Sequence, residues 1–166
     1  MFMSMLTLSI ETSCDETSLA LLYKNELEPN SKDFYTQINS YKVLASLISS
    51  QIKLHQPYGG VVPEIGARAH ASQIHLVLSE LLEIAWQNDL ASEIKIKCDS
   101  GESLSLLKEL DYIFVTTSPG LPSALKVGVE FAKTLSFFIN QKYQKIVEVT
   151  PVNHLHGHLV SCFYQR

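Results

Sequence analysis

Three histidines stand close together near the end of the sequence, in the segment NHLHGH at residues 153–158. If this segment is helical, His154 and His158 point the same way, about one turn apart, and His156 lies on the opposite side. Two neutral imidazoles so placed can bind one transition metal ion. Zinc proteases with an HExxH motif need a glutamate directly after the first histidine, and Leu155 stands there instead. We therefore predict that His154 and His158 are two ligands of a metal site.

A stable metal site needs at least a third protein ligand, and the segment ETSCDET at residues 11–17 is one place to find it. Its carboxylates, hydroxyls and thiol can coordinate a hard cation or a phosphate and water around it. Asp15, Glu16 or a residue outside the chain would supply the third ligand. A solvated hairpin turn is the other interpretation, and composition alone favours it, because such turns use Asp, Ser and Thr for backbone hydrogen bonds.

Two glycine-containing segments precede predicted helices. YGGVVPE at residues 58–64 is followed by Arg68 and His70, and TTSPGLPS at residues 116–123 joins a buried strand to a helix. Each is either a close approach of backbone to a ligand or an ordinary turn. Arg68 and His70 lie roughly 200° apart around a helix, so they cannot jointly hold one group. The second segment follows the carboxyl end of a strand, where ligands gather in open α/β sheets, but it lacks the lysine of a P-loop.

The elements that must position these residues follow from hydrophobic periodicity and turn residues. We predict strands at 6–11, 18–24, 43–50, 111–117 and 145–150, and helices at 63–86, 124–139 and 154–163. The segments 25–41 and 88–103 are predicted surface loops. The resulting order, β-β-β-α-β-α-β-α, is typical of an α/β ribonuclease-H-like lobe of the actin-like ATPase (ASKHA) superfamily, with helices packed on a mixed sheet.

The composition indicates one globular domain without a basic surface field. The chain has 166 residues, 46% of them hydrophobic and 18% charged, and a formal net charge of −4, so any RNA contact needs a local patch or a partner. Cys14, Cys98 and Cys162 form no CxxC pair, which favours a reducing compartment. No signal peptide and no apolar run of about 18 residues is found, so we predict a cytoplasmic protein without a membrane span.

Together, the motifs resemble those of the TsaD family, the tRNA N6-threonylcarbamoyladenosine transferases. The resemblance is carried by ETSCDET (11–17), HxxYGGVVPE (55–64) with RAH (68–70), VTTSPGL (115–121) and VNHxxxH (152–158), in that order. It extends from residue 8 to residue 159, except for the loops near 25–42 and 88–108. Each motif alone is ambiguous, whereas the four in order are specific.

The resemblance implies that residues 1–166 form the N-terminal lobe of a two-lobed enzyme whose C-terminal lobe is absent. The expected activity is transfer of threonylcarbamoyl from threonylcarbamoyl-adenylate to N6 of the adenosine beside the anticodon of tRNA. His154 and His158 would hold one divalent metal ion, iron or zinc, whose third ligand lies outside this chain. Glu16 matches a position implicated in catalysis. TsaB-like and TsaE-like proteins are the implied partners.

Two other functions remain open from the sequence. The first is a one-lobe, TsaB-like scaffold that pairs with a full-length relative and does no chemistry. TsaB-type proteins share the ETS start but generally lack the histidine pair, so His154 and His158 argue against this alternative. The second is a metalloprotease, which the leucine at position 155 makes the least favoured.

Overall fold

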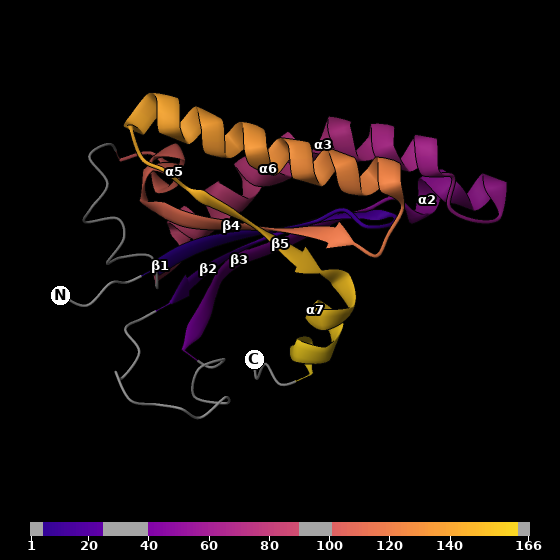
Figure 1. Ribbon diagram of the computed structural model, residues 1–166, viewed down its shortest axis with the longest axis horizontal. Coiled ribbons are helices and arrows are strands. Elements are labelled where there is room, and N and C mark those ends of the chain that lie inside the picture. The colour runs from indigo at the N-terminus through magenta and orange to yellow at the C-terminus, as the bar shows by residue number, and fades with distance from the viewer. Residues whose placement is uncertain (1–4, 25–39, 90–100, 163–166) are drawn as a thin grey trace.

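A five-stranded sheet forms the centre of the molecule (Figure 1). The structure, a computed structural model, describes residues 5–24, 40–89 and 101–162. The strands, in the spatial order β3-β2-β1-β4-β5, are β1 Met5–Glu11, β2 Glu16–Lys24, β3 Tyr41–Ser50, β4 Leu110–Ser118 and β5 Glu148–Asn153. β2 runs antiparallel to both of its neighbours, and β1, β4 and β5 are parallel to one another. This arrangement confirms the predicted ribonuclease-H-like lobe.

Two long helices cover one face of the sheet, and a short helix lies beyond the other face (Figure 1). The long helices are α3 Pro63–Gln87 and α6 Pro122–Tyr143, and each begins with a proline, which has no N–H to leave unpaired in the first turn. The short helix is α7 His154–Ser161. Shorter turns that the periodicity did not predict are α2 Ile52–His55, η1 Gln56–Tyr58, η3 Ser103–Ser105 and α5 Leu106–Glu109.

The alternation of side chains along β1 decides which residues enter the core and which reach the site. Leu6, Leu8 and Ile10 are buried in the hydrophobic core that the sheet shares with α3 and α6. Full burial of one such side chain contributes about 1.5–3 kcal/mol. Ser9 and Glu11 point to the opposite face because successive side chains of a strand alternate. The first strand therefore joins the core to the polar turn that follows it.

The last strand begins and ends three residues later than the sequence predicted. β5 includes Pro151, which is aligned with Val115 of β4. Proline is tolerated there because β5 is an edge strand with a neighbour on one side only, so its missing N–H breaks no central ladder. The other strands and the long helices follow the predicted order, and their bounds differ from the predicted ones by a few residues.

Parts of several predictions lie outside the described residues, namely most of the loop at 25–41, residues 90–100 of the loop at 88–103, and Cys98. Cys14 and Cys162 are free and exposed. Within residues 5–24, 40–89 and 101–162, no helix is both long and apolar enough to cross a membrane.

Candidate active site: the first turn and the histidine pair

The turn between β1 and β2, residues 12–15, is the point on which the sequence motifs converge. On one side it contacts the start of α6: the hydroxyl of Thr12 donates to the carbonyl of Ala124 at 3.0 Å, and the N–H of Leu121 donates to the carbonyl of Ser13 at 2.8 Å. The turn is thus held by the strand-to-helix connection of the third motif. From the sequence, this connection is interpreted as either a ligand loop or an ordinary turn. In the structure it packs against the turn that separates Glu11 from Glu16.

Glycine is required where the third motif meets the turn. A Cβ atom built on Gly120 would lie 2.7 Å from both Cβ and the carbonyl oxygen of Ser13. Such a separation is well inside van der Waals contact, so any larger residue would push the two segments apart. Eight residues further along, in the second turn of α6, a Cβ on Gly128 would overlap the side chain of Thr12. The two glycines therefore let α6 approach the turn closely.

The carboxylate of Glu11 is the centre of the polar contacts at this turn. Its Oε1 accepts from the backbone N–H of Ser13 at 2.5 Å, and its Oε2 accepts from the hydroxyl of Thr116 at 2.5 Å and from Nδ1 of His154 at 3.0 Å. Burial alone would raise the pKa of Glu11, but the hydrogen bonds from Ser13, Thr116 and His154 outweigh it and lower the pKa below its ordinary value. The carboxylate is therefore ionised at neutral pH.

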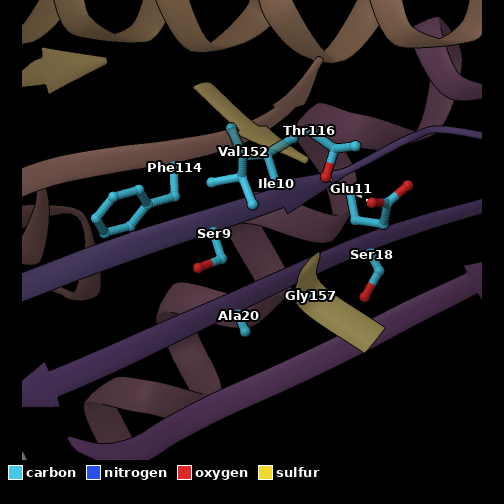
Figure 2. Close-up of a pocket in the computed structure, with 9 residues that line it drawn as sticks. All are labelled: Ser9, Ile10, Glu11, Ser18, Ala20, Phe114, Thr116, Val152 and Gly157. Atoms are coloured by element: carbon cyan, nitrogen blue, oxygen red, sulfur yellow. Dashed lines mark hydrogen bonds between the residues drawn. The ribbon is translucent and has the colours of Figure 1, made fainter. Parts of the chain in front are cut away.

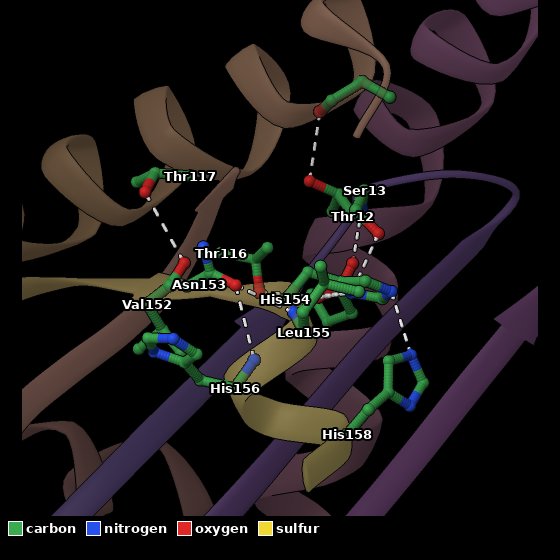
Figure 3. A network of polar contacts seen from close by, with 12 residues as sticks. Thr12, Ser13, Thr116, Thr117, Val152, Asn153, His154, Leu155, His156 and His158 are labelled. Atoms are coloured by element: carbon green, nitrogen blue, oxygen red, sulfur yellow. Dashed lines mark hydrogen bonds and ion pairs between the residues drawn. The ribbon is translucent and has the colours of Figure 1, made fainter. Parts of the chain in front are cut away.

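The two histidines four residues apart face each other on α7 (Figure 3). Nε2 of His158 lies 2.9 Å from Nε2 of His154, with the rings nearly perpendicular at 88°. The side chain of Asn153 accepts from the N–H groups of Leu155 and His156 and so begins the helix directly at the first histidine. His156 lies on the other side of the helix, as its spacing predicted (Figure 3).

These contacts fit a transition metal site in its chemistry. In a neutral His154 ring whose Nδ1 donates its proton to Glu11, Nε2 keeps a lone pair, and this lone pair lies beside Nε2 of His158. A metal-binding histidine commonly donates its other ring N–H to a carboxylate, which fixes the tautomer and the ring orientation. In the described ranges, however, no group of three or more His, Cys, Asp or Glu side chains lies close enough to hold a metal ion. The histidine pair therefore offers two nitrogen donors.

The structure brings Glu11 to His154, whereas the sequence named Asp15, Glu16 or a residue outside the chain as the third ligand. Glu16 is the exposed first residue of β2, and its backbone is paired with Ser50 of β3. Glu11 was visible in the sequence only as one carboxylate of a polar segment, because 143 positions separate it from His154. The one local clue is its place as the last residue of β1, on the face opposite the core. Although Cys14 is exposed, partial desolvation and then the neighbouring Asp15 raise the pKa of its thiol, so it is a poor nucleophile.

A pocket of about 230 Å³ opens on the sheet face turned away from α3 and α6 (Figure 2). Its floor consists of small side chains from β1 and β2, and α7 closes one side through Gly157. Glu11 and Thr116 stand at one end, so the pocket leads to the carboxylate that contacts His154. The lining residues are Ser9, Ile10, Glu11, Ser18, Ala20, Phe114, Thr116, Val152 and Gly157.

A sequence model of one protein family matches most of this chain. The family is described as TsaD, tRNA N6-adenosine threonylcarbamoyltransferase, and its model matches residues 42–98 and 99–166. The chain belongs to the TsaD family. The family resemblance carried by the four motifs is therefore confirmed.

Proteins named tRNA N6-adenosine threonylcarbamoyltransferase are similar to this TsaD-family chain along nearly all of its length. The protein of Fusobacterium nucleatum is 40% identical over 162 residues, 98% of this chain and 36% of that protein. The protein of Malacoplasma penetrans is 38% identical over 159 residues, 96% of this chain and 39% of that protein. The chain thus spans little more than a third of the length of these relatives. Among solved structures, YeaZ from Pseudomonas aeruginosa matches with a TM-score of 0.48 and 16% identity, over 90% of this chain and 43% of that one.

Proposed function

We propose that this chain is the N-terminal lobe of a cytoplasmic tRNA N6-adenosine threonylcarbamoyltransferase and provides two of its metal ligands. One observation carries the proposal: in a chain of the TsaD family, the Nε2 atoms of His154 and His158 face each other at 2.9 Å while Nδ1 of His154 is held by Glu11. The remaining length of the relatives corresponds to the C-terminal lobe, which would supply the third ligand, and residues 1–166 would form one domain.

His154 and His158 would hold one divalent metal ion, iron or zinc, through their Nε2 atoms. When bound, the ion supplies Lewis-acid polarisation of the carbonyl or phosphate of threonylcarbamoyl-adenylate. The residues of this chain prepare the site for that role. Glu11 keeps the proton of His154 on Nδ1, and Ser13 and Thr116 keep Glu11 in place by donating to its two oxygens.

In the transfer itself, a bond forms between N6 of the adenosine and the carbamoyl carbon of threonylcarbamoyl-adenylate. The bond from that carbon to the phosphate oxygen breaks, AMP leaves, and N6 loses one proton. We assign the acceptance of this proton to Glu16, whose exposed carboxylate stands at the start of β2, directly after the turn. Glu11 is unsuited to this role because its oxygens already accept three hydrogen bonds.

The tRNA is expected to contact chiefly the rest of the enzyme and its partners. The chain has a formal net charge of −4, whereas affinity for a phosphate backbone comes mainly from lysine and arginine. TsaB-like and TsaE-like proteins are the partners that we propose for the complete enzyme.

Metal binding gives a first test, and His156, on the same helix, provides the control substitution. With the polypeptide that supplies the rest of the enzyme present, His154→Ala and His158→Ala should each weaken zinc binding by more than the roughly 10–100-fold typical of losing a supporting partner. The affinity is measured by competition with a chromogenic chelator. His156→Ala, on the other side of the helix, should leave the affinity unchanged. Equal effects of all three substitutions would contradict the assignment of the two ligands.

Modification activity gives the second test. The chain is mixed with a polypeptide that supplies the rest of the family length, TsaB-like and TsaE-like proteins, threonylcarbamoyl-adenylate and tRNA. We expect threonylcarbamoyladenosine, detected by mass spectrometry of digested tRNA, only when both parts of the enzyme are present, and we expect Glu16→Gln to reduce it strongly. Activity that requires the chain but survives His154→Ala, His158→Ala and Glu16→Gln would favour the non-catalytic scaffold.

A further inference from the structure

A row of buried polar side chains lies beneath the first turn, where α2 and α3 approach it. His70 and Thr17 are fully buried, and His55 and Gln51 are only 4% and 5% exposed. Buried polar groups of this kind are normally hydrogen-bonded, because an unpaired one loses its contacts with water without replacement. The metal site and the transfer step described above use none of these four side chains.

The backbone groups at the two ends of the row fix the direction of every hydrogen bond in it. At one end, the N–H of Val62 can only donate, so Nδ1 of His55, at 3.3 Å, accepts and the ring proton stands on Nε2. That Nε2 then donates to Oε1 of Gln51 at 3.1 Å. At the other end, the carbonyl of Cys14 can only accept, so Nε2 of His70, at 3.1 Å, carries the proton there as well.

The hydrogen-bond directions set at the two ends of the row agree at the side-chain amide of Gln51. With Oε1 facing His55, its amide nitrogen faces Nδ1 of His70 at 3.1 Å and donates to it. Nδ1 of His70 is therefore an acceptor, as the proton on its Nε2 requires. Its one lone pair is shared by the hydroxyl of Thr17, which donates at 2.7 Å, and the more distant amide of Gln51. Both histidines are neutral Nε2–H tautomers. Desolvation by burial lowers the pKa of His70, which agrees with a neutral ring.

The row holds two consecutive carbonyl groups of the turn. His70 donates to the carbonyl of Cys14, and the backbone N–H of Gln51 donates to the carbonyl of Asp15 at 2.9 Å. The next residue, Glu16, begins β2. Gly66 of α3 faces the row, and a Cβ there would lie in ordinary van der Waals contact, 3.4 Å from Oε1 of Gln51 and 3.7 Å from the carbonyl oxygen of Cys14, so α3 packs directly against the row.

We propose that His70, with Gln51 and His55 behind it, is a positioning residue that holds the backbone of Cys14 and Asp15 and so sets where the Glu16 carboxylate stands. The assignment of a catalytic purpose to this position rests on the proposed function. The same arrangement accounts for the second motif, in which a histidine precedes the YGGVVPE segment and another follows it on the helix. Arg68, two residues before His70, is exposed and takes no part in the row.

The tautomers of the unmodified chain give the most direct test. Long-range ¹H–¹⁵N correlation spectra near neutral pH should show His55 and His70 as neutral rings with the proton on Nε2. A proton on Nδ1 of His70, or a charged ring, would overturn the proposal, whether or not any variant folds.

Hydrogen exchange tests whether the row holds the turn. His70→Leu removes the donor to Cys14, whereas in His70→Gln the side-chain amide can still donate from a similar position. We expect His70→Leu to speed exchange at the amides of residues 13–16 about tenfold or more relative to the core amides of β1, and His70→Gln to do so less. The control, His75→Gln, changes an exposed histidine of the same helix and should alter neither. Equal acceleration in the turn and the core would show a general loss of stability and overturn the proposal.

Activity of the reassembled enzyme separates this proposal from the proposed function. If the unmodified chain is active, His70→Leu should lower kcat with a smaller effect on the KM for threonylcarbamoyl-adenylate, and His70→Gln should restore part of it. Unchanged kcat in His70→Leu, with faster exchange in the turn, would overturn the catalytic purpose. If the unmodified chain is inactive in every assembly, the proposed function fails, and the tautomers and the exchange rates still decide whether His70 holds the turn.

Discussion

Replacing Glu11 by glutamine should reverse the tautomer of His154 and weaken metal binding. The N–H of Ser13 can only donate, so the glutamine must turn its carbonyl oxygen toward Ser13, where Oε1 of Glu11 accepts at 2.5 Å. Its amide group then faces Thr116 and His154, in place of the oxygen that accepts from both. The hydroxyl of Thr116 can rotate and accept, but Nδ1 of His154 can accept from the amide only if its proton moves to Nε2. The hydroxyl of Ser13, 3.2 Å from Nδ1, can rotate and donate to it in that tautomer.

A proton on Nε2 of His154 would occupy the lone pair that the metal needs. That nitrogen lies 2.9 Å from Nε2 of His158, so the proton would stand between the two proposed donors. Carboxylates that orient a metal-binding histidine typically contribute 10–100-fold to metal affinity. At about 1.4 kcal/mol for each factor of ten, Glu11→Gln should therefore weaken zinc binding by about 1.4–2.8 kcal/mol.

Two measurements check this prediction, with Thr116→Val as the matched control. Long-range ¹H–¹⁵N correlation spectra should show the proton of His154 on Nδ1 in the unmodified chain and on Nε2 in Glu11→Gln, and chelator competition should show the loss of affinity. Thr116→Val removes another donor to Glu11 but leaves the carboxylate facing His154, so the tautomer should stay on Nδ1. A Glu11→Gln chain that keeps both the Nδ1 proton and the original affinity would refute the reasoning.

Two further predictions concern the stability of the turn. Gly120→Ala would force a Cβ to within 2.7 Å of Ser13 and should destabilise the chain by about 1–3 kcal/mol in urea unfolding, whereas Gly60→Ala, with no atom within 4 Å of its Cβ, should cost far less. The free energy of unfolding should also decrease as the pH is lowered, in two separate pH ranges. The folded-state pKa of His70 is lowered below its ordinary 6.5, so its contribution is complete above about 6.5 and is lost as the pH falls from there, and His70→Gln should flatten this part of the profile. The pKa of Glu11 is lowered below 4.5, so its contribution is lost only as the pH falls below about 4.5; a single transition near neutral pH that persists in His70→Gln would contradict this assignment.

Local patterns in the sequence were sufficient to predict the strands, the long helices and the histidine pair. Alternation in β1 separates Leu8 and Ile10, which enter the core, from Glu11, which reaches the site, because side chains of a strand point to opposite faces. The facing of His154 and His158 follows from four-residue spacing on a helix, and the structure has that helix. These features depend on residues near one another in the chain, so they can be predicted from the periodicity of the sequence alone.

Only the tertiary structure decided which residues support those histidines. Glu11 reaches His154 because β1 lies beside β4 and β4 beside β5, so that the ends of β1 and β5 meet across 143 positions of sequence. His70 reaches the turn because α3 packs across β2 with Gly66, a residue of the same helix, facing Gln51 and the carbonyl of Cys14. Sequence periodicity cannot predict these contacts, because they depend on the order of the strands in the sheet and on how the helices cross it. The residue types of the site were thus set locally, and their partners were set by the packing of the whole lobe.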